Sequence, residues 1–262
     1  MPLQEARGPR GGLIMSLHSF QTTLGNLIRA REVDGALHKI VARSPLDDEQ
    51  CAAFGVLLAG RGLAFTREVQ RSWCKGRARN AAYLTLSMLA EDERQQLLDE
   101  WVEAGGGVAS FFAGEASAFL DFLALHLHGR QHALSICRME QAVHRANAGD
   151  ADTLATIAED VGAAALLARA PCASLVEFHA EPEVLLRAVQ SSTPLPPEQQ
   201  EPIALMFGAE LAGLFERADS FEAALWQRLA TPASWNTLLE EGHGASVIER
   251  LISLGIVCPL AS

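Results

Sequence analysis

Apolar residues in the first 170 positions recur at helical spacing. In the first such stretch they fall at i, i+3, i+7, i+10 and i+11, which puts them on one face of a helix. This stripe consists of Leu17, Phe20, Leu24, Leu27 and Ile28. The same spacing predicts helices over residues 16–31, 46–59, 64–74, 80–89, 90–102, 108–127, 133–148 and 150–169. No strand alternation is visible here, so the sequence predicts a helical array.

The pattern changes at Pro171. Two apolar runs flank Gly208-Ala-Glu210 and predict a hairpin, and a Pro-rich linker precedes it. A hairpin followed by three short helices is the order of a winged-helix-like module. The expected elements are a strand at 174–179, a helix at 181–190, a linker at 191–200, strands at 202–207 and 211–217, helices at 220–229 (capped by Ser220), 234–241 and 245–254, and a strand at 256–258.

The predicted fold class is therefore mainly α, with a small α+β part at the end. Residues 1–15 are rich in Gly, Pro and Arg and are expected to form a disordered arm. Residues 16–170 are expected to form a helical domain, and residues 171–262 are expected to form an α+β, winged-helix-like module.

Composition and charge narrow the class of protein. Hydrophobic residues make up 49% of the 262 positions, which excludes a disordered chain. The net charge of −11 argues against nucleic-acid binding and against a membrane-surface role. No apolar run is long enough to span a bilayer. The five cysteines are far apart and include no CxxC, which favours a reducing cytoplasm over a disulfide framework.

Candidate metal chemistry rests on a cluster of histidines. His126, His128 and His132 form an HxHxxxH pattern, but a continuous helix would put only the last two on a common face. Cys137 and Glu140 follow on the next helix. The alternative is a polar helix end that carries surface histidines, and the expectation is that this chain holds no metal or cofactor of its own. Common nucleotide-binding, nucleophile-elbow and zinc-protease motifs are absent from the sequence.

Other reactive side chains have weaker patterns. Cys137 lies among apolar residues and is expected to be a small core residue rather than a nucleophile. Glu115 and Asp121 interrupt an apolar helix, but their spacing does not put them on one face for acid–base catalysis. Arg138 follows Cys137 among apolar residues, where an arginine is either paired or points to an interface, and an interface is the expectation.

The basic residues gather in the first third of the chain. Residues 1–80 carry a net charge of +5, whereas 81–172 and 173–262 each carry −8. This segment is either a solvated helix face or a docking surface for an acidic partner. The residues predicted to meet a partner subunit are Arg67, Arg71, Lys75, Arg77, Arg138 and Glu140.

A winged-helix-like module can bind DNA or a peptide. An acidic module disfavours DNA, because phosphate neutralisation supplies most of the affinity. A sheet with a free edge can instead accept an extended peptide as an added strand. The expected edge is residues 211–217 with the helix at 245–254 beside it. The predicted peptide-binding residues are Leu211, Gly213, Leu214, Phe215, Arg217, Ile248 and Leu251.

Several segments between residues 105 and 258 resemble a known family. The segments are Gly107-VASFFAG-Glu115, Phe119-LDF-Leu123, His132-ALSICRMEQ-Ala142, and further on ASLVEFH, PEVLL, PLPP, FEAALWQRLATPA, LLEEG and IERLISLGI. Together they are similar to the partner subunits of multinuclear non-heme iron oxidative enzymes that modify ribosomally made peptides, such as those of the 3-thiaglutamate and methanobactin pathways.

The resemblance implies a division of labour. The iron and the oxidation would belong to a separate oxidase subunit, and this chain would form a heterodimer with it and bind the leader of a precursor peptide. In the 3-thiaglutamate type, the complex would excise the β-carbon of a C-terminal cysteine. Two alternatives remain open from the residues alone: a winged-helix transcription regulator, and a stand-alone metalloenzyme.

Overall fold

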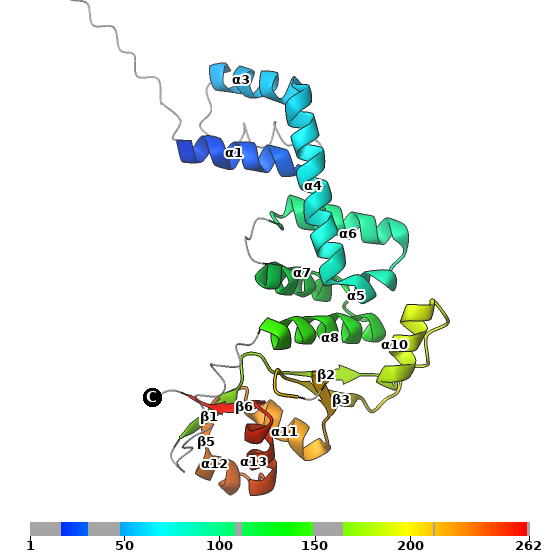
Figure 1. Ribbon diagram of the computed structural model, residues 1–262, viewed down its shortest axis with the longest axis vertical. Coiled ribbons are helices and arrows are strands. Elements are labelled where there is room, and N and C mark those ends of the chain that lie inside the picture. The colour runs from blue at the N-terminus through cyan, green and yellow to red at the C-terminus, as the bar shows by residue number, and fades with distance from the viewer. Residues whose placement is uncertain (1–16, 31–47, 108–111, 149–164, 212, 261–262) are drawn as a thin grey trace, which may run out of the picture. The chain divides into compact units, whose positions relative to one another are not determined.

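The computed structural model describes most of the chain (Figure 1). The described residues are 17–30, 48–107, 112–148, 165–211 and 213–260. They form two compact units. One contains the described residues up to Cys74 together with Val102–Gly105, and the other contains Lys75–Trp101 and the described residues from Gly106 onward. The predicted arm, residues 1–15, lies outside the described part.

The first unit is helical. Its elements are α1 (Leu17–Arg29), α3 (Asp48–Ala59) and the first part of α4 (Arg61–Ala81). Phe20 of α1 stacks on Phe54 of α3, with ring centroids 5.2 Å apart. Leu27 and Phe54 are buried. Of the apolar stripe predicted for the first helix, Leu27 is therefore buried and Phe20 packs on α3.

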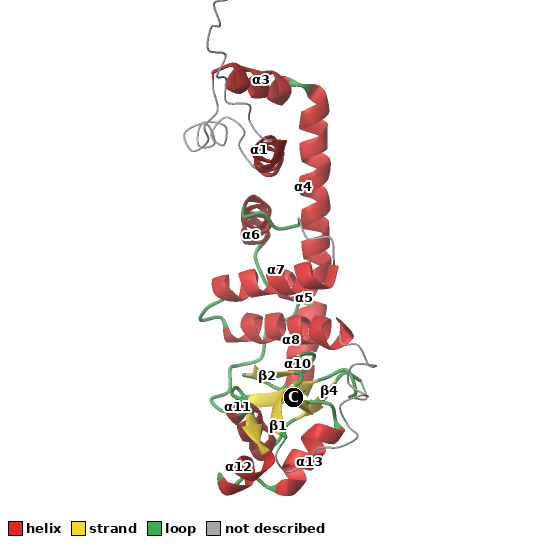
Figure 2. Ribbon diagram, turned by 90° about the vertical axis from the view of Figure 1, so that its left-hand side faces the viewer, coloured by secondary structure: helices red, strands yellow, loops and turns green. Residues whose placement is uncertain are grey.

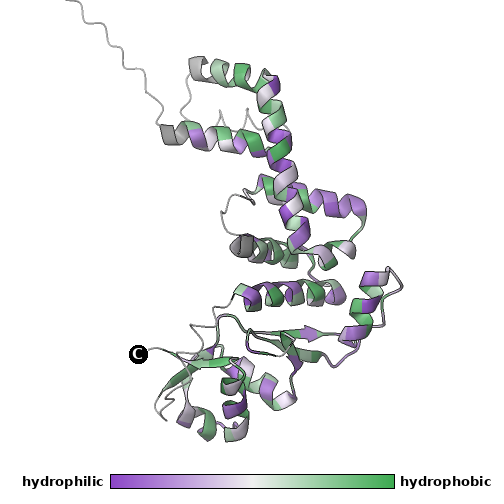
Figure 3. Ribbon diagram, viewed as in Figure 1, coloured by the Kyte–Doolittle hydropathy of each residue, from purple (hydrophilic) through white to green (hydrophobic). Residues whose placement is uncertain are grey.

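The second unit opens with a layer of helices. After the end of α4 come α5 (Tyr83–Ser87), most of α6 (Glu91–Glu103), α7 (Phe112–His126) and α8 (Gln131–Ala148). Leu98, Phe119, Leu123 and Cys137 are buried together between them. Figure 3 shows α7 as largely hydrophobic and α6 as largely hydrophilic. This contrast fits a helix enclosed by neighbours and a helix with a solvent-exposed face.

The first sheet packs on the other side of α8. It consists of β2 (Ser174–Phe178), β3 (Ile203–Phe207) and β4 (Phe215–Arg217), in that order and antiparallel throughout. Ile136 and Met139 of α8 are buried together with Val176 and Phe178 of β2. α10 (Pro182–Ser191) joins β2 to β3 and adds Leu185 to the same cluster.

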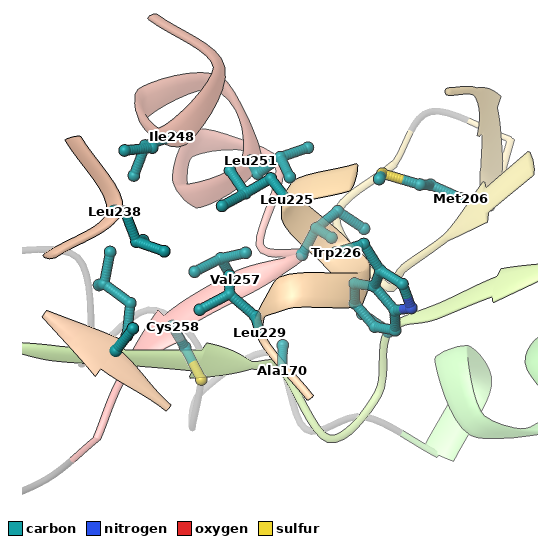
Figure 4. Packing of buried hydrophobic residues seen from close by; sticks show 14 of the residues in the cluster. Ala170, Met206, Leu225, Trp226, Leu229, Leu238, Ile248, Leu251, Val257 and Cys258 are labelled. Atoms are coloured by element: carbon teal, nitrogen blue, oxygen red, sulfur yellow. The ribbon is translucent and has the colours of Figure 1, made fainter. Parts of the chain in front are cut away.

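A second antiparallel sheet carries the last helices. Its strands are β5 (Ala233–Ser234), β1 (Leu166–Arg169) and β6 (Val257–Pro259), in that order. The helices are α11 (Ser220–Arg228), α12 (Trp235–Glu240) and α13 (Ala245–Ser253). Leu225, Leu238, Ile248 and Leu251 meet over this sheet in a core shown in Figure 4. Figure 2 shows the strands gathered between α8 and the last helices.

This architecture confirms the predicted mainly α class, because helices dominate the described chain and the two sheets are small. The predicted domain boundary near residue 170 differs from the structure. α8 buries one face on α7 and another on β2, so the helices from α5 onward and both sheets belong to one compact unit.

Three local expectations are corrected. Leu166–Arg169, expected at the end of a helix, forms β1 with partners on both sides; residues 150–164 of that expected helix lie outside the described part. Asp219 rather than Ser220 caps α11, since its side chain accepts from the N–H groups of Phe221 and Glu222. The last strand of the first sheet begins at Phe215 rather than at Leu211.

Candidate functional site

The strand β4 forms an edge of its sheet. Among the described residues it pairs with β3 alone. The Ala218 N–H donates to the Ala204 carbonyl at 3.0 Å, so Ala218 directs its main-chain groups toward β3. Because this direction alternates along an antiparallel strand, Phe215 and Arg217 direct their N–H and C=O groups away from β3. The edge can therefore hydrogen bond to an added strand.

Arg250 fixes the helix α13 beside this edge. Its Nη2 lies 2.6 Å from a carboxylate oxygen of Glu216 in β4, and its Nε lies 2.6 Å from one of Glu222 in α11. The hydrogen bonds to Glu216 and then Glu222 raise the pKa of Arg250. Glu222 is buried and also accepts from the Asp219 N–H. One guanidinium thus joins β4, α11 and α13.

Two exposed aromatic rings lie close to the edge in the sequence. Phe215, in β4, is 47% exposed and packs partly on Phe207 at a centroid distance of 5.6 Å. Phe221, in the first turn of α11, is 70% exposed. Exposed aromatic surface of this kind favours contact with apolar side chains of a ligand.

The turn that leads into β4 has an unusual backbone. Leu214 has φ 71°, and Gly213 before it has φ 86°. The Leu214 N–H donates to the Leu211 carbonyl at 2.9 Å. A leucine in the left-handed region costs about 1–2 kcal/mol, so the turn is held against a local preference.

This strain gives a stability prediction. Leu214→Asn is expected to leave the free energy of unfolding unchanged or to raise it by up to about 1 kcal/mol, because asparagine tolerates positive φ. Leu214→Val is expected to lower it by about 1 kcal/mol, because a β-branched residue is disfavoured there. Urea unfolding of both variants checks the order, and equal stabilities would contradict the strain argument.

The predicted peptide-binding residues divide into three groups. Gly213 and Leu214 belong to the turn that leads into β4. Phe215 and Arg217 lie on the open edge, and Arg217 also pairs with Glu181 at 2.6 Å. Leu211 is buried, and Ile248 and Leu251 have no exposed surface. These three side chains are a correction: they belong to the core under α13 and do not line a surface groove.

The predicted partner-docking cations make contacts within the chain. Arg67 donates to the Ala30 carbonyl at 2.7 Å, and Arg71 donates to the Arg29 carbonyl, so both bind the C-terminal end of α1. In the second unit, Lys75 pairs with Asp99 at 2.7 Å, and Arg77 pairs with the buried Glu115. These contacts give the basic segment a structural role, and its docking role stays a prediction.

Glu140 and Arg138 lie on different faces of α8. The Glu140 carboxylate accepts from the N–H groups of Leu84 and Thr85, at 2.8 and 3.0 Å, and so holds the start of α5. Burial raises the pKa of Glu140, which the Thr85 hydrogen bonds oppose. Arg138 is exposed and donates to Gln141 at 2.8 Å and to Asp121 at 3.4 Å. Of the two, Arg138 is the one open to a ligand.

The three candidate metal ligands have separate surroundings. His132 is buried, and its Nε2 lies 2.8 Å from the Pro196 carbonyl. His126 is exposed, with its Nδ1 2.8 Å from the Phe122 carbonyl, and His128 is exposed as well. Within the described ranges, no group of three His, Cys, Asp or Glu side chains converges as a metal site would require.

Cys137 occupies the core, as its apolar neighbours predict. It has no exposed surface, and its Sγ lies 3.3 Å from the Leu120 carbonyl. Burial raises the pKa of the thiol to about 12, which keeps it protonated near neutral pH. A nucleophilic role would require an exposed thiolate.

The charged group around Arg250 is not evident from the sequence. Its members Glu216, Glu222 and Arg250 come from three separate elements, and charge spacing along the chain does not show which ones meet. One signal was available: Asp219 and Glu222 have the spacing of a capping box, which identifies the start of α11.

No family model and no curated protein matches the chain.

Across the residues that the structure describes, none of the helices combines the length and apolar character needed to cross a bilayer.

Proposed function

We propose that this chain is the non-catalytic partner subunit of an iron-dependent oxidase and binds the leader of a ribosomally made precursor peptide. The open edge of β4 is the observation that carries the proposal, since Phe215 and Arg217 direct main-chain groups outward beside α13. An added strand would gain main-chain hydrogen bonds there. The rings of Phe215 and Phe221 would contact its side chains.

The order of elements supports a winged-helix-like module. The helices α11, α12 and α13 follow one another, β5 lies between the first two, β6 follows the third, and β1 completes the sheet. The negative charge of this module favours binding of a peptide over binding of DNA. Residues 173–262 carry a net charge of −8, and Arg250, the basic residue of α13, is already paired with two carboxylates.

The oxidase would supply the iron and the oxygen chemistry, and this chain would hold the substrate. The reaction we propose for the complex is excision of the β-carbon of a C-terminal cysteine. The helical part of the chain would dock the oxidase. Cys137, Cys172 and Cys258 are free and buried thiols, which supports a reducing compartment such as the cytoplasm.

Reconstitution tests this function. The full chain is mixed with the iron oxidase and the short precursor peptide encoded nearest to its gene. We expect the two proteins to co-elute in size-exclusion chromatography, and the pair to bind the peptide at least tenfold more tightly than the oxidase alone. Equal peptide affinity without this chain, or full oxidation by this chain alone, would contradict the proposal.

A further inference from the structure

The first sheet has a second open edge, on β2. The Ser135 hydroxyl of α8 donates to the Glu177 carbonyl at 2.7 Å, so that carbonyl points away from β3. Glu177 lies opposite Ala204, whose carbonyl is bonded to β4. Because the direction of the main-chain groups alternates along the strand, the N–H and C=O groups of Leu175 point away from β3 as those of Glu177 do. Among the described residues, β2 pairs with β3 alone.

This edge opens into a pocket of about 270 Å³. Leu134, Ser135 and Arg138 line it from one face of α8, Leu175 and Glu177 line it from β2, and Gln227 lines it from α11. The volume lies just below the roughly 300 Å³ at which ligand pockets begin, so it suits a short stretch of peptide better than a large ligand. Apolar side chains and outward main-chain groups occur together in its wall.

The direction in which α8 runs along β2 places the positively charged side chain of Arg138 at one end of the pocket. His132, at the start of α8, lies against Pro196, and the nearby Gln199 N–H donates to the His179 carbonyl just after β2. α8 therefore begins at the end of β2 and runs back along it. Arg138, one turn beyond Ser135, lies toward Leu175 at the start of β2.

Arg138 can accept a new partner. Its ion pair with Asp121 is long, at 3.4 Å, and both side chains are about half exposed, at 48% and 56%. Such a pair contributes little to stability in water. A guanidinium in this setting can exchange Asp121 for a ligand carboxylate and form two charge-assisted hydrogen bonds with it.

We propose that this pocket binds the C-terminal end of a peptide, which lies antiparallel to β2 with its terminal carboxylate on Arg138. The direction follows from the geometry, because the last residue of a strand antiparallel to β2 lies at the start of β2. The outward N–H and C=O of Leu175 and the outward N–H of Glu177 bond the peptide main chain, while the Glu177 carbonyl keeps its bond to Ser135. Leu134 and Leu175 contact the peptide side chains. The site is on the opposite edge from β4 and does not depend on leader binding.

Titration of the full chain with the acetylated tetrapeptide Ala-Val-Ala-Val tests the proposal. The probe is used with a free carboxyl terminus and as its C-terminal amide, and binding is followed by ¹⁵N chemical shifts. We expect the free acid to bind at least tenfold more tightly than the amide. Arg138→Gln should remove this difference, whereas Arg145→Gln, an exposed position on the same helix, should preserve it.

Main-chain pairing is tested separately. Glu177→Pro removes the outward N–H and should weaken binding of the free acid at least fivefold relative to Glu177→Ala. Leu134→Trp, which fills the pocket, gives the same test if the proline variant does not fold. Equal binding of acid and amide, or no binding at 10 mM, would overturn the proposal. So would binding that is kept in Arg138→Gln and lost in Arg217→Pro, since the peptide would then lie on β4.

Discussion

Replacement of Glu115 by glutamine is expected to lower the free energy of unfolding by about 3 kcal/mol. Glu115 is 4% exposed and pairs with Arg77, whose side chain is 23% exposed. The substitution removes the negative charge and leaves the Arg77 guanidinium partly buried without this partner. Removal of one member of a buried ion pair costs more than the pair contributes, because the other charge has already lost its hydration. Urea unfolding followed by circular dichroism measures the change.

Two further variants separate this effect from a general loss of charge. The double variant Arg77→Met with Glu115→Leu replaces both groups by apolar side chains of similar size, and most of the lost stability should return. Glu91→Gln removes an acid from the exposed pair with Arg94 and should leave the unfolding midpoint unchanged. If Glu115→Gln were as stable as Glu91→Gln, the buried pair would have no structural role.

Helical periodicity predicted where the elements lie along the chain better than it predicted which elements pack against one another. The stripe of the first helix and the strand at 174–179 were located because spacing along the chain reports which residues share a face. The two buried faces of α8 were not foreseen, since the sequence does not say that Cys137 packs toward α7 while Ile136 packs on β2. That second face is what joins the helices to the sheets in one unit.

The strand β1 was missed for a related reason. Leu166–Arg169 is short and apolar, and it continues a helical pattern. Its extended form depends on pairing with β5 and β6, which lie more than 60 residues further along the chain. Strand preference depends strongly on such neighbours, so a local pattern does not settle it.

The candidate site was predicted in outline but not in detail. The hairpin, the edge and the helix beside it follow from the order of elements. Apolar residues on an amphipathic helix suit both a core and a ligand surface, so the pattern alone does not distinguish the two for Ile248 and Leu251. In the structure both residues belong to the core, and Arg250 makes the contact between α13 and β4.

Substitution of Arg217 by proline is expected to weaken binding of the precursor leader at least tenfold. Arg217 directs its N–H away from β3, so proline removes a donor that faces the incoming strand and leaves the pairing of β4 with β3 in place. The proline ring also obstructs the approach of a second main chain. A tenfold loss corresponds to about 1.4 kcal/mol, which is within the usual contribution of a main-chain hydrogen bond. Fluorescence anisotropy with a labelled leader peptide measures the affinity.

The matched control is Arg217→Ala, which retains the N–H but loses the ion pair with Glu181. Because both side chains of that pair are about half exposed, its loss alone should change leader affinity by less than threefold. The difference between proline and alanine at this one position therefore reports strand addition and not charge. If both variants bound the leader as tightly as the unmodified chain, with unchanged circular dichroism, the leader would not pair with β4, and the proposed peptide-binding function would lose the observation that carries it.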